Sequence, residues 1–147
     1  MDASGPALED ARENLRLNGI DPARHGFETA DAFAWSPPGP VGLLICDPPS
    51  LTHGARSDTA ARNAYRDLAA RCGPWVAQGG LLATASCTAR LSFDRWEQAL
   101  REGLRRAGRW TCLWRAAEPP DHPTALEHPE GRYLKFSVLR RLSGAPV

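Results

Sequence analysis

Apolar residues along this chain follow two alternating patterns, one with helical spacing and one with the continuous character of buried strands. Uninterrupted apolar runs at 41–46 and 81–85 predict strands of a parallel sheet, because a strand covered on both faces is apolar at every position. Shorter apolar stretches predict two more strands, around 110–114 and 133–139. Helical spacing predicts helices over 5–17, about 58–76 and 93–107.

Glycines, prolines and polar caps mark where these elements end. Ser4 and Ser92 are N-cap candidates for the first and last helices, because a serine hydroxyl accepts a hydrogen bond from the first turn. The run Pro37–Pro40 predicts a turn before the first strand. Gly79 and Gly80 are expected to end the middle helix and so to precede the second strand.

The alternation of strands and helices predicts a mostly parallel α/β sheet in a single domain over 1–147. Ligands of such sheets bind beyond the carboxyl ends of the strands. No Gly-x-Gly-x-x-Gly loop follows any strand of the chain, although folds of this class usually carry a glycine-rich loop after their first strand. We therefore expect the first strand of the fold and its loop to lie outside this sequence.

Composition narrows the class of protein only a little. The formal net charge is +1, from 18 basic and 17 acidic residues, so a polyanion would have to bind a local patch. No apolar run reaches the roughly 20 residues of a membrane span and no leader-like segment opens the chain, which favours a cytoplasmic protein. The four cysteines lack metal-ligand spacing, so we expect free thiols and no bound metal.

Asp47 and Cys87 follow the two most apolar strands, and one helical connection separates those strands. Right-handed βαβ geometry would make the strands parallel and adjacent, about 4.8 Å apart, so both side chains could reach one planar group. Pro48 and Pro49 stiffen the backbone beside Asp47. The pair is therefore a candidate active site.

Seven segments resemble, in order, the bacterial 23S rRNA cytosine-C5 methyltransferases. They are Met1–Ser4, Leu15–Gly19, Asp31–Phe33, Cys46–Ser50, Ala85–Thr88, Pro120–Pro123 and Gly131–Phe136. The resemblance implies a Rossmann-like S-adenosylmethionine-dependent methyltransferase sheet whose last strand is antiparallel. It also implies that 1–147 is the C-terminal part of the catalytic domain, truncated before the second strand, and that 23S rRNA is the partner.

The same resemblance assigns roles to individual residues. Asp2 would hold the ribose hydroxyls of S-adenosylmethionine, Asp31 would contact its adenine, and Asp47 would lie between the methyl donor and the base. Cys87 would be the nucleophile. Pro48 would contribute to both the cofactor and the substrate sites, and Pro49 and Ser50 to the substrate site.

These residue types suit methylation of cytosine at C5. That carbon becomes nucleophilic only after a thiolate has added at C6, and Asp47 could hydrogen-bond the N3/N4 edge of the base. A free thiol is mostly protonated at neutral pH, so positive charge is expected nearby, with Arg56 and Arg90 as candidates. Ser50 is neither the aromatic residue typical of amino-group methyltransferases nor a second cysteine, which favours the single-cysteine kind of C5 enzyme.

Two alternatives remain at this point: an inactive fragment or RNA-binding remnant, and a guanine or small-molecule methyltransferase on the same fold. Several other residues are interpreted as structural or solvated, with substrate contact by the loop histidine and phosphate contact by the arginines as the less favoured interpretation. The residues expected to be structural or in the core are Cys46, Cys72, Cys112, Trp96, Trp110 and Trp114. Those expected to be solvated or at the surface are His53, His122, His128, Arg56, Arg62 and Arg66.

Overall fold

The computed structural model describes residues 1–51 and 57–143. These residues form two compact units that divide after Pro38. In the first unit, α1 (Gly5–Leu17) begins at Ser4, whose Oγ accepts a hydrogen bond from the Ala7 amide at 3.3 Å. The helix stops at Asn18, and Gly19 takes a φ of 69°, which favours glycine. The predicted first helix and its cap are therefore confirmed. A short 3-10 helix, Pro22–Arg24, follows.

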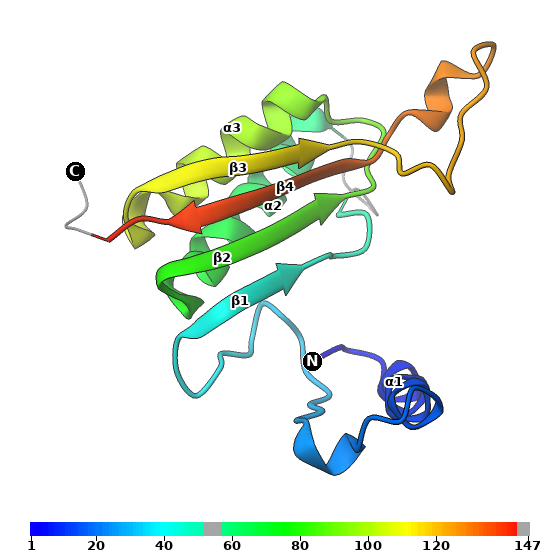
Figure 1. Ribbon diagram of the computed structural model, residues 1–147. Coiled ribbons are helices and arrows are strands. Elements are labelled where there is room, and N and C mark those ends of the chain that lie inside the picture. Colours follow the sequence, from blue (N-terminus) through cyan, green and yellow to red (C-terminus); the bar gives the residue numbers. More distant parts are fainter. Residues whose placement is uncertain (52–56, 144–147) are drawn as a thin grey trace. The chain divides into compact units, whose positions relative to one another are not determined.

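The second unit is a four-stranded sheet with two helices (Figure 1). The strand order is β1-β2-β4-β3, in which β1 is parallel to β2 and β4 is antiparallel to both of its neighbours. Three strands therefore run one way and the last strand runs against them, as expected. The elements are β1 (Val41–Cys46), α2 (Asp58–Cys72), β2 (Val76–Ser86), α3 (Phe93–Leu104), β3 (Trp110–Ala116) and β4 (Lys135–Arg141). Three further 3-10 turns, Gly73–Trp75, Arg105–Ala107 and Pro129–Gly131, complete the unit.

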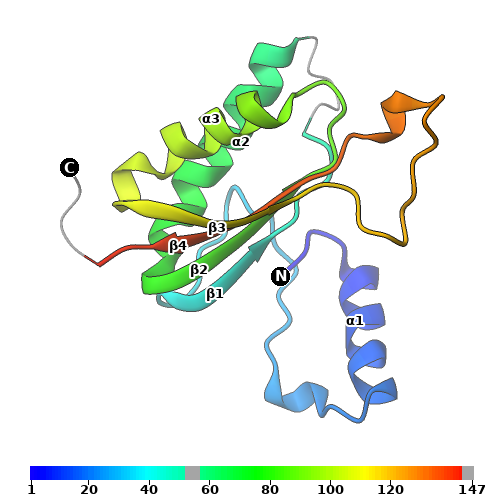
Figure 2. The same ribbon diagram turned by 45° about the horizontal axis from the view of Figure 1, so that its top comes forward.

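Both helices of this unit pack on one face of the sheet (Figure 2). The core between them contains Trp96, Leu100 and Leu104 of α3, Tyr65 of α2 and Leu82 of β2. On the opposite face of β1, Leu43 and Ile45 are 54% and 70% exposed. The expectation that β1 is covered on both faces is thus wrong for this unit, because α2 and α3 lie on the same side.

The second strand begins earlier than its sequence predicts. The middle helix ends at Cys72 rather than near Val76, because Gly73 and Pro74 form a 3-10 turn. Gly79 and Gly80, expected to precede the strand, lie inside it, where the pairing with β1 shifts register between Val41 and Leu43. Gly79 has a φ of 79°, so glycine here permits a bulge instead of ending an element.

Candidate active site

Asp47 and Cys87 leave the sheet at the carboxyl ends of two adjacent parallel strands. The register aligns Cys46 of β1 with Thr84 of β2, so Asp47 lies level with Ala85 and Cys87 lies two residues further along. The Asp47 side chain is exposed, and Cys87 is a half-buried free thiol. The predicted adjacency of the two strands is therefore confirmed, while the roles of the two residues stay predictions.

The residues that follow Asp47 form the rim of this edge. Pro48 and Ser50 are half-buried and Pro49 is exposed. His53 and Arg56 lie outside the described residues. Arg90 is exposed three residues beyond Cys87 and forms no ion pair with any residue that the structure describes. The rim thus consists of two prolines and a serine next to the Asp47 carboxylate.

A groove of about 390 Å³ lies on the face of the sheet opposite α2 and α3, and Asp47 is one of its lining residues. Its other walls include Ile45, Ala85, Trp114 and Phe136. The rings of Trp114 and Phe136 meet edge to face, with centroids 6.1 Å apart. Trp114 was expected in the core but is 63% exposed, because β3 turns this side chain toward the face that carries no helix. The groove therefore offers planar apolar walls next to a carboxylate.

Lys135 is a buried cation beside Cys87 that the sequence interpretation missed. It is 4% exposed, and its Nζ donates hydrogen bonds to the Thr88 carbonyl at 2.8 Å and the Tyr133 carbonyl at 2.6 Å. Burial lowers the pKa of Lys135, while the charges of Glu118 and Cys87 act in the opposite direction. A signal was present in the sequence, because this is the chain's one lysine among 18 basic residues.

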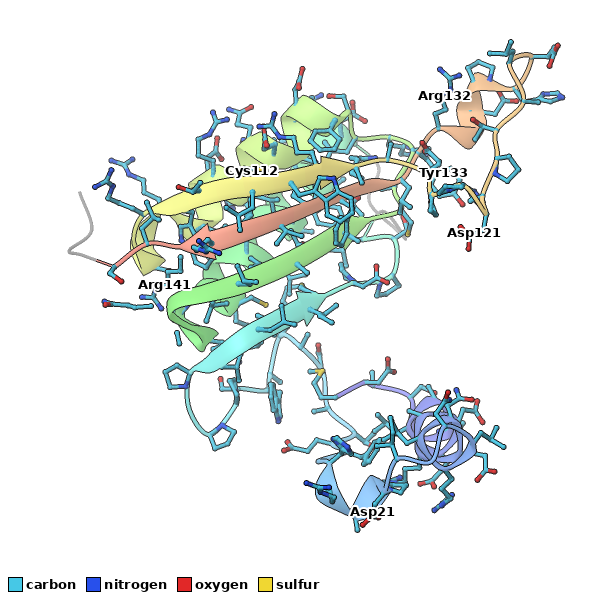
Figure 3. All side chains as sticks on the ribbon, in the orientation of Figure 1. Asp21, Cys112, Asp121, Arg132, Tyr133 and Arg141 are labelled. Carbon is cyan, nitrogen blue, oxygen red and sulfur yellow. The ribbon has the colours of Figure 1, made fainter. Side chains whose placement is uncertain are left out.

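Glu118 supplies negative charge near Lys135. Its Oε1 accepts a hydrogen bond from the Leu134 amide at 2.9 Å. Desolvation works against the charged form of Glu118, but hydrogen bonds from backbone amides outweigh it and lower the pKa of this carboxyl. Figure 3 shows Tyr133 near the base of the 117–134 segment, which projects from the edge where β1, β2 and β3 end. The Tyr133 ring packs edge to face against His122, with centroids 5.8 Å apart.

Tyr65 of α2 lies beneath the two strand ends. Burial raises the pKa of its hydroxyl, and the charges of Cys87 and Asp47 raise it further, while the nearby Ser86 hydroxyl acts against the shift. The Tyr65 side chain is 2% exposed. Its hydroxyl has no hydrogen-bond partner of acceptable geometry among the described residues. Tyr65 thus places a buried, neutral ring under Asp47 and Cys87.

The first unit carries the two carboxylates assigned to the cofactor. Asp2 and Thr29 form a parallel bridge, in which the Asp2 amide donates to the Glu28 carbonyl and the Asp2 carbonyl accepts from the Ala30 amide. The Asp2 carboxylate accepts from the Ser4 amide at 2.7 Å, and that of Asp31 accepts from the Phe33 amide at 2.8 Å. Both side chains are exposed, and neither forms an ion pair with a described residue. Each carboxylate is held by its own turn and remains accessible to a ligand.

The remaining candidates lie away from this edge or are already paired. Cys46 and Cys72 face each other: the hydrogen bond from the Cys72 thiol lowers the pKa of Cys46, while Cys46 and burial raise that of Cys72. Cys112 was expected in the core but is exposed on β3. Arg62 is bound by both carboxylate oxygens of Glu102, at 2.8 and 2.9 Å, and Arg66 pairs with Asp67. Their charges are therefore already compensated.

Metal ligands and membrane spans were searched among the described residues. No group of three or more His, Cys, Asp or Glu side chains in 1–51 and 57–143 could hold a metal ion. None of the helices in that part of the chain has the length and apolar character of a membrane span.

Comparison with solved structures addresses the fold. The chain superposes on SMU.776, solved with SAH and proposed to be a methyltransferase, with a TM-score of 0.74 at 17% identity, covering 93% of this chain and 37% of that one. It also superposes on the N-methyltransferase NodS from Bradyrhizobium japonicum WM9, solved with S-adenosyl-L-homocysteine. That TM-score is 0.62 at 12% identity, over 97% of this chain and 65% of NodS. The chain has the fold of S-adenosylmethionine-dependent methyltransferases.

Sequence relatives point to one group of these proteins, although no protein-family model matches the chain. A ribosomal RNA large subunit methyltransferase of Deinococcus radiodurans is 37% identical over 146 residues, which are 95% of this chain and 35% of that protein. The ribosomal RNA large subunit methyltransferase I of Pseudoalteromonas atlantica is 31% identical over 148 residues, 97% of this chain and 38% of that protein. The chain thus spans little more than a third of the length of these curated relatives.

Proposed function

We propose that this protein is an S-adenosylmethionine-dependent RNA methyltransferase that methylates C5 of a cytosine in large-subunit rRNA through a covalent adduct with Cys87. The observation that carries the proposal is the placement of Asp47 and Cys87 at the carboxyl ends of adjacent parallel strands. The names of the relatives support the RNA substrate, and the methyltransferase fold supports the cofactor.

In the proposed reaction, Cys87 acts on C6 of the base and Asp47 acts on its N3/N4 edge. The Cys87 thiolate adds to C6, and the electron pair of the C5–C6 double bond moves toward C5 and the N3/N4 edge. The Asp47 carboxylate accepts a hydrogen bond from the N4 amino group and holds the base in its N3-protonated form, so the proton at N3 neutralises the charge that the addition delivers there. S-adenosylmethionine, when bound, supplies the electrophilic methyl group that C5 takes. Loss of the C5 proton to a base then restores the double bond and expels the Cys87 thiolate.

The carboxylates of the first unit fit the cofactor by their chemistry. Ribose hydroxyls and the adenine amino group are hydrogen-bond donors, and exposed carboxylates are acceptors with two oxygens each. Asp2 and Asp31 each use one oxygen in a local turn, which fixes the direction of the carboxylate. We infer that Asp2 holds the ribose and that Asp31 contacts the adenine, with Pro48 beside the methyl donor.

Local charge supports an RNA substrate despite the balanced net charge. A groove of about 420 Å³ between α3 and β3 is lined by Arg101, Arg105, Arg109 and Arg115, with Glu97 as its acidic residue. Glu97 pairs with Arg115 and, at 4.0 Å, with Arg101. The groove therefore retains positive charge at Arg105 and Arg109, neither of which forms an ion pair with a described residue. Phosphate groups are the partners that such guanidinium groups favour.

Trapping the adduct tests the proposal directly. The full-length protein is incubated with S-adenosylmethionine and large-subunit rRNA fragments that contain 5-fluorocytosine. After methyl transfer the fluorine cannot leave as a proton does, so the enzyme stays bound to the RNA and migrates slowly in denaturing gels. Wild type and Cys112→Ser, which removes an exposed thiol of β3, should form this complex, and Cys87→Ser should not.

The same experiment separates the alternatives. A Cys87→Ser protein that still methylates RNA at the wild-type rate would overturn the thiol mechanism. Nuclease digestion followed by mass spectrometry of the nucleosides identifies the modified base. Methylguanosine in place of 5-methylcytidine would favour a guanine enzyme, and methylation of no RNA would overturn the substrate assignment.

A further inference from the structure

Lys135 is distinctive in both its residue type and its position. The 18 basic residues of the chain are 17 arginines and this one lysine. Among the described residues Lys135 is also the one basic side chain that is buried. It is the first residue of β4 and lies directly opposite Ser86, the last residue of β2, in the antiparallel register. Its position therefore adjoins the segment that carries Cys87.

The contacts of Lys135 hold that segment in place. Its Nζ donates hydrogen bonds to two backbone carbonyls. One belongs to Thr88, one residue after Cys87, and the other to Tyr133, two residues before β4 begins. An ammonium group has three donors in a compact arrangement, which suits two carbonyls in a buried space better than a planar guanidinium does. Ser86 contributes as well, because its Oγ accepts a hydrogen bond from the Thr88 amide at 3.4 Å. The turn from Ser86 to Thr88 is thus fixed from both sides.

A buried ammonium is costly unless negative charge or strong acceptors compensate it. The ionisable groups that act on Lys135 are the Glu118 carboxylate from the segment after β3 and the Cys87 thiol from the end of β2. Tyr65, from α2, interacts with Cys87 and carries no charge at physiological pH, since a tyrosine hydroxyl ionises only well above neutrality and burial raises the pKa of Tyr65 further. Among the described residues, Glu118 is thus the carboxylate whose charge acts on Lys135, and the hydrogen bond from its Nζ to the Thr88 carbonyl places the ammonium group one residue from Cys87.

We propose that Lys135 is a positioning residue that fixes the Ser86–Thr88 turn and stabilises the Cys87 thiolate by its charge. The proposal rests on the proposed function, in which Cys87 is the nucleophile. Lys135 acts through Cys87 and does not touch the substrate, because its Nζ is buried and bound to two backbone carbonyls. The exposed Arg90, expected from the sequence to supply this charge, is not needed for the role.

The reactivity of the thiol itself tests the proposal. Alkylation of Cys87 by iodoacetamide is followed as a function of pH, with peptide mass spectrometry to separate Cys87 from the other three thiols. Lys135→Met keeps the length of the side chain and removes its charge. We expect its alkylation profile to move to higher pH by about one unit, which is about a tenfold slower reaction at neutral pH. Lys135→Arg, which keeps the charge, should retain most of the wild-type profile.

A matched control and a second variant keep the result decisive. Arg140→Met removes an exposed charge from the same strand and should leave the Cys87 profile unchanged. Glu118→Gln removes the opposing carboxylate but keeps an acceptor for the Leu134 amide, so it should move the profile to lower pH. A folded Lys135→Met with a wild-type profile overturns the proposal. If Lys135→Met does not fold, an unchanged profile in Glu118→Gln overturns it.

This readout is independent of methyl transfer. If Cys87→Ser proved to be active on RNA, the proposed nucleophile would be wrong, yet the alkylation profile would still report whether Lys135 controls the thiol. A shifted profile together with an inactive Cys87→Ser protein supports both proposals.

Discussion

Gly103 of α3 lies directly against the backbone carbonyl of Arg66 on α2, and nothing larger than hydrogen fits between the two helices at this point. A Cβ added to Gly103 would also meet the Ala69 side chain at 2.8 Å and the Ala70 amide at 2.9 Å. Because two of these three neighbours are backbone atoms, a side chain at this position cannot be accommodated by a change of rotamer. This close approach sets the spacing of the layer that supports Tyr65 and, above it, the candidate site.

We expect Gly103→Ala to destabilise the protein even though alanine favours helix formation. Separating α2 from α3 would open a packed core, and overpacking of this kind costs about 1–3 kcal/mol in the free energy of unfolding. Urea unfolding followed by circular dichroism measures the change. Gly42→Ala is the control, since no atom lies within 4 Å of a Cβ added there. Equal stabilities of the two variants would contradict the proposed close contact.

Tyr65 provides a prediction that depends on pH. Burial raises its pKa, so the folded state binds a proton that the unfolded chain loses near pH 10; stability is therefore lost as pH rises past that point. Tyr65→Phe should lack this alkaline loss. At neutral pH the variant should differ from wild type by about 1 kcal/mol or less, because it removes a buried hydroxyl without a well-placed partner.

Unfolding in urea at pH 7 and above pH 10 checks this expectation. Tyr133→Phe, which changes the only other tyrosine of the chain, should keep the alkaline loss that Tyr65 causes. If Tyr65→Phe and wild type lost the same stability at high pH, the tyrosine would not be the titrating group.

The arginine groove predicts how RNA binding depends on salt. Replacing Arg105 and Arg109 together by alanine should weaken binding of a short fluorescein-labelled RNA about tenfold at moderate salt. The slope of log affinity against log salt should fall by about 1.4, as expected for the loss of two phosphate contacts. Fluorescence anisotropy over a salt series measures both quantities. An unchanged slope would exclude the groove as a phosphate site.

The control for this prediction removes the same amount of charge elsewhere. Arg16 and Arg24 are exposed in the first unit, and Arg16 is already paired with Glu13. Their double replacement by alanine should leave the salt slope close to that of wild type. An equal loss in both double variants would indicate a response to net charge alone.

How far the sequence predicts this structure depends on whether a signal is local. The apolar run Val41–Cys46 and the caps Ser4 and Ser92 are local, and each predicts its element correctly. Gly79 and Gly80 are local as well, but glycine marks a helix end and a bulge equally well. Only the pairing of β2 with β1 decides between the two.

The candidate site likewise contains residues that local sequence signals predict and residues that they do not. Asp47 and Cys87 follow apolar runs with one helix between them, so their adjacency was predictable. The proximity of Lys135 to Cys87 was not predictable, although its being the chain's one lysine marked it out, because β4 lies between β2 and β3 and pairs with β2, which is far away in the sequence. The exposure of Trp114 also depends on which face of the sheet the helices cover, which the apolar pattern of β3 does not determine.

Asp47→Asn tests the role of the carboxylate without changing its shape. In the proposed reaction Asp47 stabilises the base as Cys87 adds, so the variant should lose about 100-fold or more in the rate of methyl transfer, a loss typical of removing one electrostatic group from an active site. Alkylation of Cys87 at neutral pH should stay within about twofold of wild type, since a neutral amide replaces an exposed carboxylate that solvent screens.

Single-turnover transfer from radiolabelled S-adenosylmethionine, measured in the full-length protein, gives the rate. Asp10→Asn, an exposed change on α1, should transfer at the wild-type rate. If Asp47→Asn lost neither rate nor RNA affinity, the carboxylate would lie outside the reaction, and Cys87 would need another group to orient the base.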